Sequence, residues 1–462
     1  MSDTRDWARE QLAFADFGHV RRVDRAVEML RRAAERPSGQ LTRVFDDAAE
    51  LQAAYNFVEG AVPPAAIVRA FASAALAAAS GETVNVVIDG TSLSLTDRTK
   101  TKGFGSVGKR EFPTRGLKVI DAIAVSPDGV PLGMLDLHFW ARAEKGEASR
   151  FVRRRSGETE VRHWVDVIAS TGDLVRHAGI RPHFIIDREG DCADMLRAVA
   201  DGGDFTIRAA QYRRICLHDA KRRGLLETMK RVRSVGRHRV TLPRSSQRRA
   251  RIADLEVRHA RVVLDLPDRQ TGGRGPLEVT VVWATERRAP HGEAPLDWML
   301  LTSDRVRSRG AAVEVLRRYC LRWRVEDFHR TWKAGRCRVE DSQLRSTDHV
   351  VRWATMLAAV ALRVERLKHL ARTEPDAPAT AELSPLEIDA LRAAKRHGFT
   401  KRTEVITDDV PSMRLAVRWI AQMGGFHGRE HVQPGAATLG RGLERLMTLT
   451  KGFALGLKTA RK

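Results

Sequence analysis

The run of residues 315–334, VLRRYCLRWRVEDFHRTWKA, constrains the fold of this chain more than any other segment. It is compatible with one continuous helix whose apolar residues share a face, as expected for packing against a core. At about 100° per residue, four polar residues share an arc of roughly 60° on the other face. These four are Tyr319, Arg322, Glu326 and Lys333.

The polar face of this run carries one carboxylate, that of Glu326, among a phenol, a guanidinium and an ammonium. It spans about 14 residues, or roughly 21 Å, which is the axial length of about six base pairs. The pattern indicates a metal ligand within a strip that grips phosphates. The alternative is a solvated helix face on which Arg322 and Glu326 form an ordinary ion pair four residues apart.

The charge of the chain favours a polyanionic partner. Its 462 residues carry a formal net charge of +22, and the sequence pI is about 10.7. Nucleic acid is the first candidate and an anionic membrane surface the second. No apolar run approaches the roughly 20 residues that span a bilayer, so we expect no membrane partner.

The chain also shows no sign of export. The N-terminus, MSDTRDWARE, lacks the apolar core of a signal peptide. The four cysteines show no close paired spacing, which argues against a zinc finger or a disulfide framework. We therefore expect a cytoplasmic protein.

The first 75 residues have the apolar spacing of helices at about 7–14, 20–34 and 48–58. Three arginines, Arg21, Arg22 and Arg25, lie together near the start of the second of these helices. A small basic helical module at one end of the chain predicts a domain that reads DNA. The alternative is a helical cap whose arginines are merely solvated.

From residue 83 the apolar pattern becomes that of strands. Residues 83–88 form an apolar β-branched run that stops at Asp89, and residues 183–186 form another that stops at Asp187. Between Arg208 and Arg261 there are 17 Lys and Arg against four Asp and Glu. We expect a strand-rich basic insertion over about 208–302, followed by helices with a linker near 373–381. A disordered basic arm is the alternative for the insertion.

Two aspartates that end strands and a glutamate on a helix make the layout that a two-metal phosphoryl-transfer site requires. Mg²⁺ prefers a few carboxylates, with substrate phosphates completing its coordination. We assign Asp89, Asp187 and Glu326 as the ligands. Five other carboxylates lie in plausible places, and helical geometry disfavours Asp327 because it lies about 100° around the helix from Glu326. The five are Asp97, Glu189, Asp191, Asp327 and Glu340.

Three motifs together resemble the bacterial insertion-sequence transposases that have a DDE site and a Tyr-Arg-Glu-Lys signature. They are Asp89-Gly90-Thr91-Ser92-Leu93-Ser94, Asp187-Arg188-Glu189 and Tyr319-x2-Arg322-x3-Glu326-x6-Lys333. The likeness is to the transposon-five type within the insertion-sequence-four family, and it covers nearly the whole chain. Softer matches include Ala54-Tyr55-Asn56-Phe57, Pro295-Leu296-Asp297-Trp298 and Gly424-Gly425-Phe426.

This resemblance implies an α/β fold with an RNase H-like catalytic core that a β-strand insertion interrupts. The domains would be 1–75, a helical domain that binds transposon ends; 76–372, the catalytic domain; and 373–462, a C-terminal helical dimerisation domain. The partners would be double-stranded DNA, as inverted ends and as target, and a second copy of the chain in a synaptic dimer. The resemblance also implies a bacterial protein associated with the nucleoid.

The same resemblance assigns roles to individual residues. Asp89, Asp187 and Glu326 would ligate two Mg²⁺ or Mn²⁺ ions per active site. Tyr319, Arg322 and Lys333 would hold phosphates near the cut, with Arg330 standing where the family often has lysine. Trp298 would hold a flipped base during cleavage through a DNA hairpin, with Trp323 as a second stacking surface. The alternative for Trp298 is a core residue. Val20 replaces a proline that commonly precedes the paired arginines, which leaves the end-binding contacts of Arg21, Arg22 and Arg25 open.

The sequence therefore predicts a cut-and-paste DNA transposase. Two rivals remain at this point. One is an RNase H-like structure-selective nuclease, which would hydrolyse DNA without transferring a strand. The other is a regulator, or a decayed copy of the element, that binds ends without cutting them.

Overall fold

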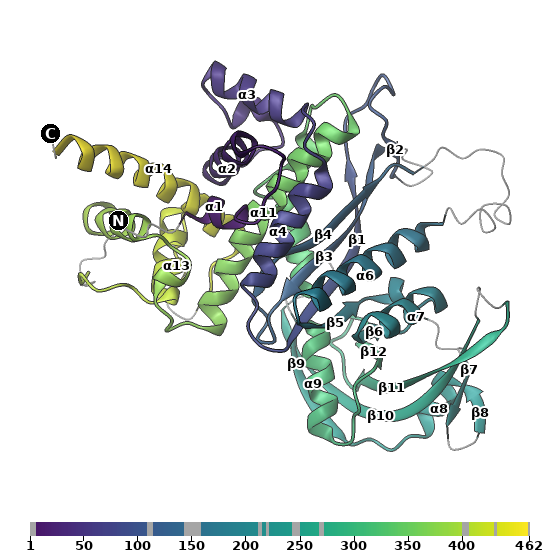
Figure 1. Cartoon of the computed structure of the whole chain (residues 1–462). Helices are drawn as coiled ribbons and strands as arrows, with labels where there is room; N and C mark the ends of the chain where they lie inside the picture. Colours follow the sequence, from purple (N-terminus) through teal and green to yellow (C-terminus); the bar gives the residue numbers. More distant parts are fainter. Residues whose placement is uncertain are drawn as a thin grey trace. The chain divides into compact units, whose positions relative to one another are not determined.

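The structure of the chain is a computed structural model that describes residues 6–108, 114–142, 159–210, 215–218, 221–242, 250–267, 272–399, 406–428 and 432–460. It is a mixed α/β protein with a mixed sheet and helical flanks. The chain forms two compact units (Figure 1). Unit 1 comprises Met1–Ser80, Gly90–Glu147 and Arg324–Lys462, and unit 2 comprises Gly81–Asp89 and Ala148–Trp323.

Unit 1 is built mainly of helices, which come from both ends of the chain. The long helix α11 (Thr347–Thr373) is buried along nearly its whole length. Trp353 on this helix donates its indole N–H to the carbonyl of Ser38, 3.0 Å away, and so attaches the N-terminal helices to it. These helices are α1 (Trp7–Gln11), α2 (Val20–Glu35), α3 (Ala48–Val58) and α4 (Pro64–Ala77).

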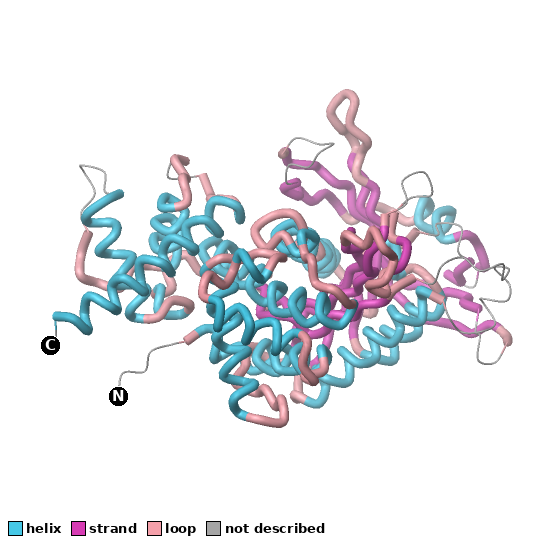
Figure 2. Tube along the Cα trace, turned by 90° about the horizontal axis from the view of Figure 1, so that it is seen from above, coloured by secondary structure: helices cyan, strands magenta, loops and turns pink. Residues whose placement is uncertain are grey.

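The C-terminal part of unit 1 packs around an apolar cluster that includes Leu367, Leu391, Ile420 and Leu439. In Figure 2 the described part of the chain near the C-terminus is drawn as helices and loops. Its helices are α12 (Pro385–Ala394), α13 (Met413–Met423) and α14 (Ala436–Ala460).

The strands of unit 1 include a hairpin. Strands β3 (Arg115–Val125) and β4 (Pro131–Trp140) pair antiparallel, with β-bulges near Ala122 and Ala124. The short strand β2 (Gly105–Ser106) pairs with the start of β3. Helices α4 and α11 both pack on β4, so this hairpin has a helical cover.

Unit 2 contains three neighbouring parallel strands, which are the part of β1 (Thr83–Ser94) up to Asp89, β5 (Arg181–Ile186) and β6 (Asp204–Arg208). Helices α6 (Glu160–His177) and α7 (Ala193–Gly202) pack against each other, side by side in Figure 1. Such parallel strands are apolar because they are buried on both faces, and Val86, Ile88 and Ile185 are fully buried.

Beyond β6 the sheet of unit 2 becomes antiparallel, in the order β6-β12-β11-β10. The long strands β10 (Arg251–Pro267) and β11 (Arg274–Glu286) form a ribbon, and β12 (Asp297–Thr302) joins it to β6. The remaining elements are β7 (Ile215–His218), β8 (Lys221–Gly224), α8 (Leu225–Arg231), β9 (Gly236–Leu242) and α9 (Arg309–Cys320). The basic segment 208–302 thus contains ordered strands.

Strand β1 is longer than the sequence pattern predicts. It does not stop at Asp89 but continues to Ser94. The extension is held because Leu93 is fully buried and the N–H of Leu95 donates to the carbonyl of Arg115 on β3. The prediction that Asp89 lies at a strand tip is therefore wrong, because Asp89 lies within β1.

The prediction of one helix over residues 315–334 is also wrong. Helix α9 ends at Cys320, and helix α10 (Trp323–Trp332) begins after a turn at Leu321 and Arg322. Tertiary contacts explain the break. Arg322 is held by an ion pair within unit 2, while Arg324 donates to the carbonyl of Gly129 in unit 1, 2.7 Å away. Helix propensity is weak enough to yield to such contacts.

Among the residues that the structure describes, no helix combines the length and the apolar content that crossing a bilayer requires.

Candidate active site

Asp89 and Asp187 occupy equivalent positions on neighbouring parallel strands of unit 2. Ile88 on β1 is the register partner of Ile186 on β5, and each aspartate is the next residue along its chain. Adjacent strands lie about 4.8 Å apart, so the two backbones are close. Both aspartates are half-buried, which leaves them partly accessible beside a fully buried apolar pair.

Three side chains surround the carboxylate of Asp187. The hydroxyl of Tyr319 donates to Oδ1 at 2.9 Å, Nη1 of Arg322 lies 3.5 Å from Oδ2, and Nη1 of Arg208 lies 3.8 Å from Oδ1. Burial and the charge of Asp187 raise the pKa of Tyr319 above its usual value of 10.0, so Tyr319 remains a donor. Unit 2 therefore brings together three of the residues that the sequence singled out.

Arg208 is a residue of this site that the sequence reasoning missed. It ends strand β6, the third parallel strand, and its Nη2 also donates to the carbonyl of Asp297 at 3.0 Å. The rule that selected Asp187, a charged residue where a buried strand ends, applies equally to Arg208. In the sequence Arg208 stands out only as one of many basic residues in the insertion.

Trp298 lies against the same group of residues, but it is buried. Only 4% of its surface is exposed, and its ring meets those of Tyr319 and Trp323 edge-on, with centroids 5.3 and 6.1 Å away. In this structure Trp298 packs as a core residue, whereas Trp323 is half-buried. The base-holding roles of both tryptophans remain predictions.

Glu326 lies in the first turn of α10, in unit 1, and is exposed to solvent. Lys333 follows directly after the end of α10. Its Nζ lies 3.2 Å from Oγ1 of Thr91 and 3.8 Å from the carboxylate of Glu340. Thr91 belongs to β1 and follows Asp89 by two residues. The meeting of Glu326 with the two aspartates of unit 2 remains a proposal.

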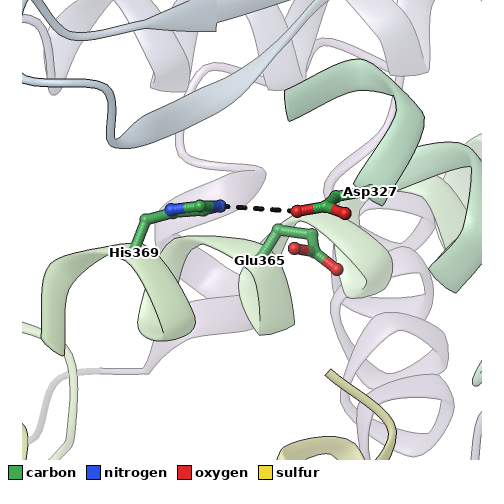
Figure 3. A group of neighbouring side chains, drawn as sticks. All are labelled: Asp327, Glu365 and His369. Carbon is green, nitrogen blue, oxygen red and sulfur yellow. Dashed lines mark ion pairs between the residues drawn. The ribbon is translucent and has the colours of Figure 1, made fainter. Parts of the chain in front are cut away.

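Asp327, the neighbour of Glu326, belongs to a different group of side chains. Figure 3 shows it beside Glu365 and His369 of α11, with the edge of the His369 ring directed at its carboxylate. The potential ligand atoms of these three residues lie within 4.8 Å of one another, which would suit a metal ion. However, the ammonium of Lys368 lies 2.7 Å from Oδ2 of Asp327 and also contacts Glu365.

The charges in this second group are strongly coupled. Burial alone would raise the pKa of Asp327, but His369 and the charge of Lys368 outweigh burial and hold that pKa below 3.8. Burial lowers the pKa of His369 to about 4, so the imidazole is neutral at neutral pH. Arg330, 72% exposed, pairs with Asp327 at 3.0 Å rather than extending alone into solvent.

The three N-terminal arginines lie at the start of α2. Arg21 and Arg22 are exposed and Arg25 is half-buried. Arg22 also donates to the carbonyl of Phe17 at 3.0 Å, which closes the turn before the helix. Their contacts with DNA remain predictions.

Three of the alternative carboxylates form hydrogen bonds or ion pairs within their own units, whereas Glu189 is exposed. Asp97 is buried and pairs with Arg115 at 3.3 Å, and Asp191 accepts from the N–H of Ala210 at 2.7 Å. Glu340 accepts from the N–H of Ser94 at 2.8 Å. These contacts explain the presence of the three carboxylates without a metal.

The donor set of unit 2 suits a hard divalent cation. Asp89 and Asp187 offer oxygen ligands from adjacent strands, and both side chains are partly accessible. Mg²⁺ and Mn²⁺ prefer such oxygen donors, with DNA phosphates supplying further oxygens. Arg208 and Arg322 provide the positive charge that would hold those phosphates nearby.

Two family models match the chain, and they cover different parts of it. Residues 4–61 match the model described as transposase DNA-binding, which includes α1 to α3 and the three N-terminal arginines. Residues 162–363 match the transposase DDE domain, which includes Asp187, Arg208, Tyr319 and Glu326 but begins after Asp89. A DDE domain implies dependence on divalent metal, and the DNA-binding match supports DNA as a partner. Together the two matches support a DNA transposase of the DDE type.

Proposed function

We propose that this protein is a cut-and-paste transposase of the insertion-sequence-four family that acts as a dimer on paired inverted ends. The observation that carries the proposal is the placement of Asp89 and Asp187 directly after the register pair Ile88 and Ile186, with Tyr319, Arg322 and Arg208 around the second carboxylate. A basic chain with a transposase DNA-binding match supports it.

In this proposal Asp89, Asp187 and Glu326 hold two Mg²⁺ or Mn²⁺ ions on an RNase H-like core. The ions would activate the attacking water or 3′ hydroxyl and stabilise the leaving oxygen. Arg322, Arg208 and Lys333 bind phosphates near the cut, and the hydroxyl of Tyr319 fixes the carboxylate of Asp187. Arg330, which is exposed, contacts phosphates further from the cut.

We further propose that the freed 3′ hydroxyl attacks the opposite strand to form a hairpin, with Trp298 or Trp323 stacking on a flipped base. Stacking on an aromatic ring offsets part of the few kcal/mol that unstacking costs. Because Trp298 is buried in this structure, its ring must become accessible when DNA binds.

The test is cleavage and strand transfer with DNA that carries the inverted ends. The wild type in Mg²⁺ or Mn²⁺ should release the ends and join them to a target duplex, and Glu326→Gln should do neither. Glu314→Gln is the matched control, because Glu314 is an exposed glutamate on α9. Unchanged cleavage by Glu326→Gln would remove Glu326 from the mechanism. Hydrolysed ends without strand transfer would indicate a nuclease, and end binding without cleavage a regulator.

A further inference from the structure

Helix α10, which carries Glu326, is attached to α11 at three points within unit 1. Lys368 of α11 donates to Asp327 at 2.7 Å, Thr331 donates to Oε1 of Glu365 at 2.6 Å, and the indole of Trp332 donates to a carbonyl of α11 at 2.9 Å. Glu365 and Lys368 are only 1% and 7% exposed at their side chains. The attachments therefore lie in a buried interface between the two helices.

The opposite side of α10 is attached to the sheet of unit 1. Nε2 of His329 lies 2.5 Å from Oδ1 of Asp121, a fully buried carboxylate on β3. At about 100° per residue, Asp327 and Thr331 lie roughly 100° and 140° around the helix from Glu326, while His329 lies roughly 60° away in the other direction. Glu326 thus projects between two lines of attachment, which together oppose rotation of α10 about its axis.

Lys368 connects the two carboxylates of the buried interface. Its ammonium contacts Asp327 and Glu365, which Figure 3 shows projecting from facing helices. An ammonium has three donors and can satisfy both carboxylates. A metal ion in the same place would have to displace Lys368. The cluster of Asp327, Glu365 and His369 is therefore better explained by ion pairs with Lys368 than as a metal centre.

We propose that Lys368 is a positioning residue for Glu326: it binds Asp327 of α10 directly, holds Glu365 on its own helix where Thr331 of α10 donates to it, and so sets the affinity of the active site for divalent ions. This inference depends on the proposed function, because it takes Glu326 to be a metal ligand. Groups that orient a metal ligand typically change metal affinity about 10- to 100-fold when they are removed.

The test compares Lys368→Met, Lys368→Arg and Thr331→Val with the wild type. Lys395→Met is the matched control, because Lys395 is a buried lysine of unit 1 whose ammonium donates to Gln422 of α13, 2.8 Å away. We would measure Mn²⁺ binding by electron paramagnetic resonance with end DNA present, and hydrogen exchange of the α10 amides. Cleavage against Mn²⁺ concentration is a third measurement.

Lys368→Met should bind Mn²⁺ about tenfold more weakly, exchange its α10 amides faster and approach wild-type cleavage at saturating Mn²⁺. Lys368→Arg should restore most of the affinity, because it keeps the charge. Thr331→Val removes one hydrogen bond with almost no change in shape, and we expect a loss of about threefold. If Lys368→Met does not fold, the result for Thr331→Val decides.

Wild-type Mn²⁺ affinity in both Lys368→Met and Thr331→Val would overturn the inference. An equal loss in Lys395→Met would also overturn it, because the effect would then be a general loosening of unit 1. Glu326→Gln distinguishes the proposed metal-ligand role of Glu326 from the positioning role of Lys368. If that variant keeps wild-type Mn²⁺ affinity, the proposed role of Glu326 fails; if it loses affinity while Lys368→Met does not, only the positioning role fails.

Discussion

Asp187 in unit 2 and Asp327 in unit 1 both lie among basic side chains, but the two carboxylates are held differently. Asp187 in unit 2 receives one short hydrogen bond from Tyr319, while its arginines stand 3.5 and 3.8 Å away. Asp327 in unit 1 is bound by a buried lysine at 2.7 Å, which also contacts Glu365. Cationic neighbours at these longer distances would still allow Asp187 to bind a metal ion, whereas the close ammonium of Lys368 holds Asp327 in a structural ion pair.

The largest expected difference between the two groups is in catalysis. Asp187→Asn should lower single-turnover cleavage at saturating Mn²⁺ by about 10³-fold or more, equivalent to about 4 kcal/mol. Asp327→Asn should lower it by no more than about tenfold, because excess metal compensates for a misplaced ligand. Similar losses in the two variants would contradict the distinction.

The free energy of unfolding should depend more on the Asp327 group than on Asp187, which is the reverse of the order expected for catalysis. Lys368→Met leaves two carboxylates facing each other in a buried interface, and we expect the free energy of unfolding to fall by about 3 kcal/mol. Asp187→Asn should change it by less than about 1 kcal/mol. Urea titration provides the comparison. The double variant Glu365→Gln/Lys368→Met should regain part of the loss, and no recovery would argue against an electrostatic origin.

The pH dependence of stability should distinguish the Asp327 group through His369. The unfolded chain binds a proton on this residue below about pH 6.5, but the folded chain does so only near pH 4. The folded state therefore loses stability as the pH falls through this window, by about 2 kcal/mol between about pH 7 and pH 5. His369→Gln should lose correspondingly less, as judged by the difference in urea midpoints. An identical pH profile in the variant would exclude His369 as the source.

The smallest expected effect concerns salt. If Arg322 contacts a phosphate, Arg322→Ala should reduce the slope of log affinity for end DNA against log salt by about 1. Lys368→Met should leave the slope as it is, since its ammonium is buried. The wild type should itself lose affinity strongly between about 50 and 200 mM salt. If the affinity of the wild type for end DNA does not change with salt, the protein does not bind DNA through a basic contact surface.

The sequence predicts the local parts of the site because they depend on local patterns. Apolar β-branched runs before Asp89 and Asp187 are enough to identify two buried strands, and in the structure these runs pair in parallel register. The extension of β1 was missed because it depends on Leu93 and on pairing with β3, a contact between distant segments. Arg208 was missed because charge was counted over the whole insertion instead of being placed on a strand end.

The surroundings of Glu326 were harder to predict for the same reason. Helix periodicity places Asp327 off the polar face of the 315–334 run, but it does not reveal that the partner is Lys368, 41 residues further along the chain. Nor does it reveal the break between α9 and α10, which tertiary contacts of Arg322 and Arg324 impose. Long-range ion pairs leave no periodic trace in the residues that form them.

The turn at Leu321 and Arg322 changes how the signature motif should be used in searches. The intervals between Tyr319, Arg322, Glu326 and Lys333 do not measure positions on one helix, because Tyr319 lies on α9, Arg322 in the turn and Glu326 on α10, with Lys333 just after its end. A helical wheel drawn over 315–334 places the four residues on one arc, but it gives their directions correctly only within each helix. Fixed spacing that allows a turn between the two helices is the better criterion, and the length of that turn is the quantity to compare between relatives.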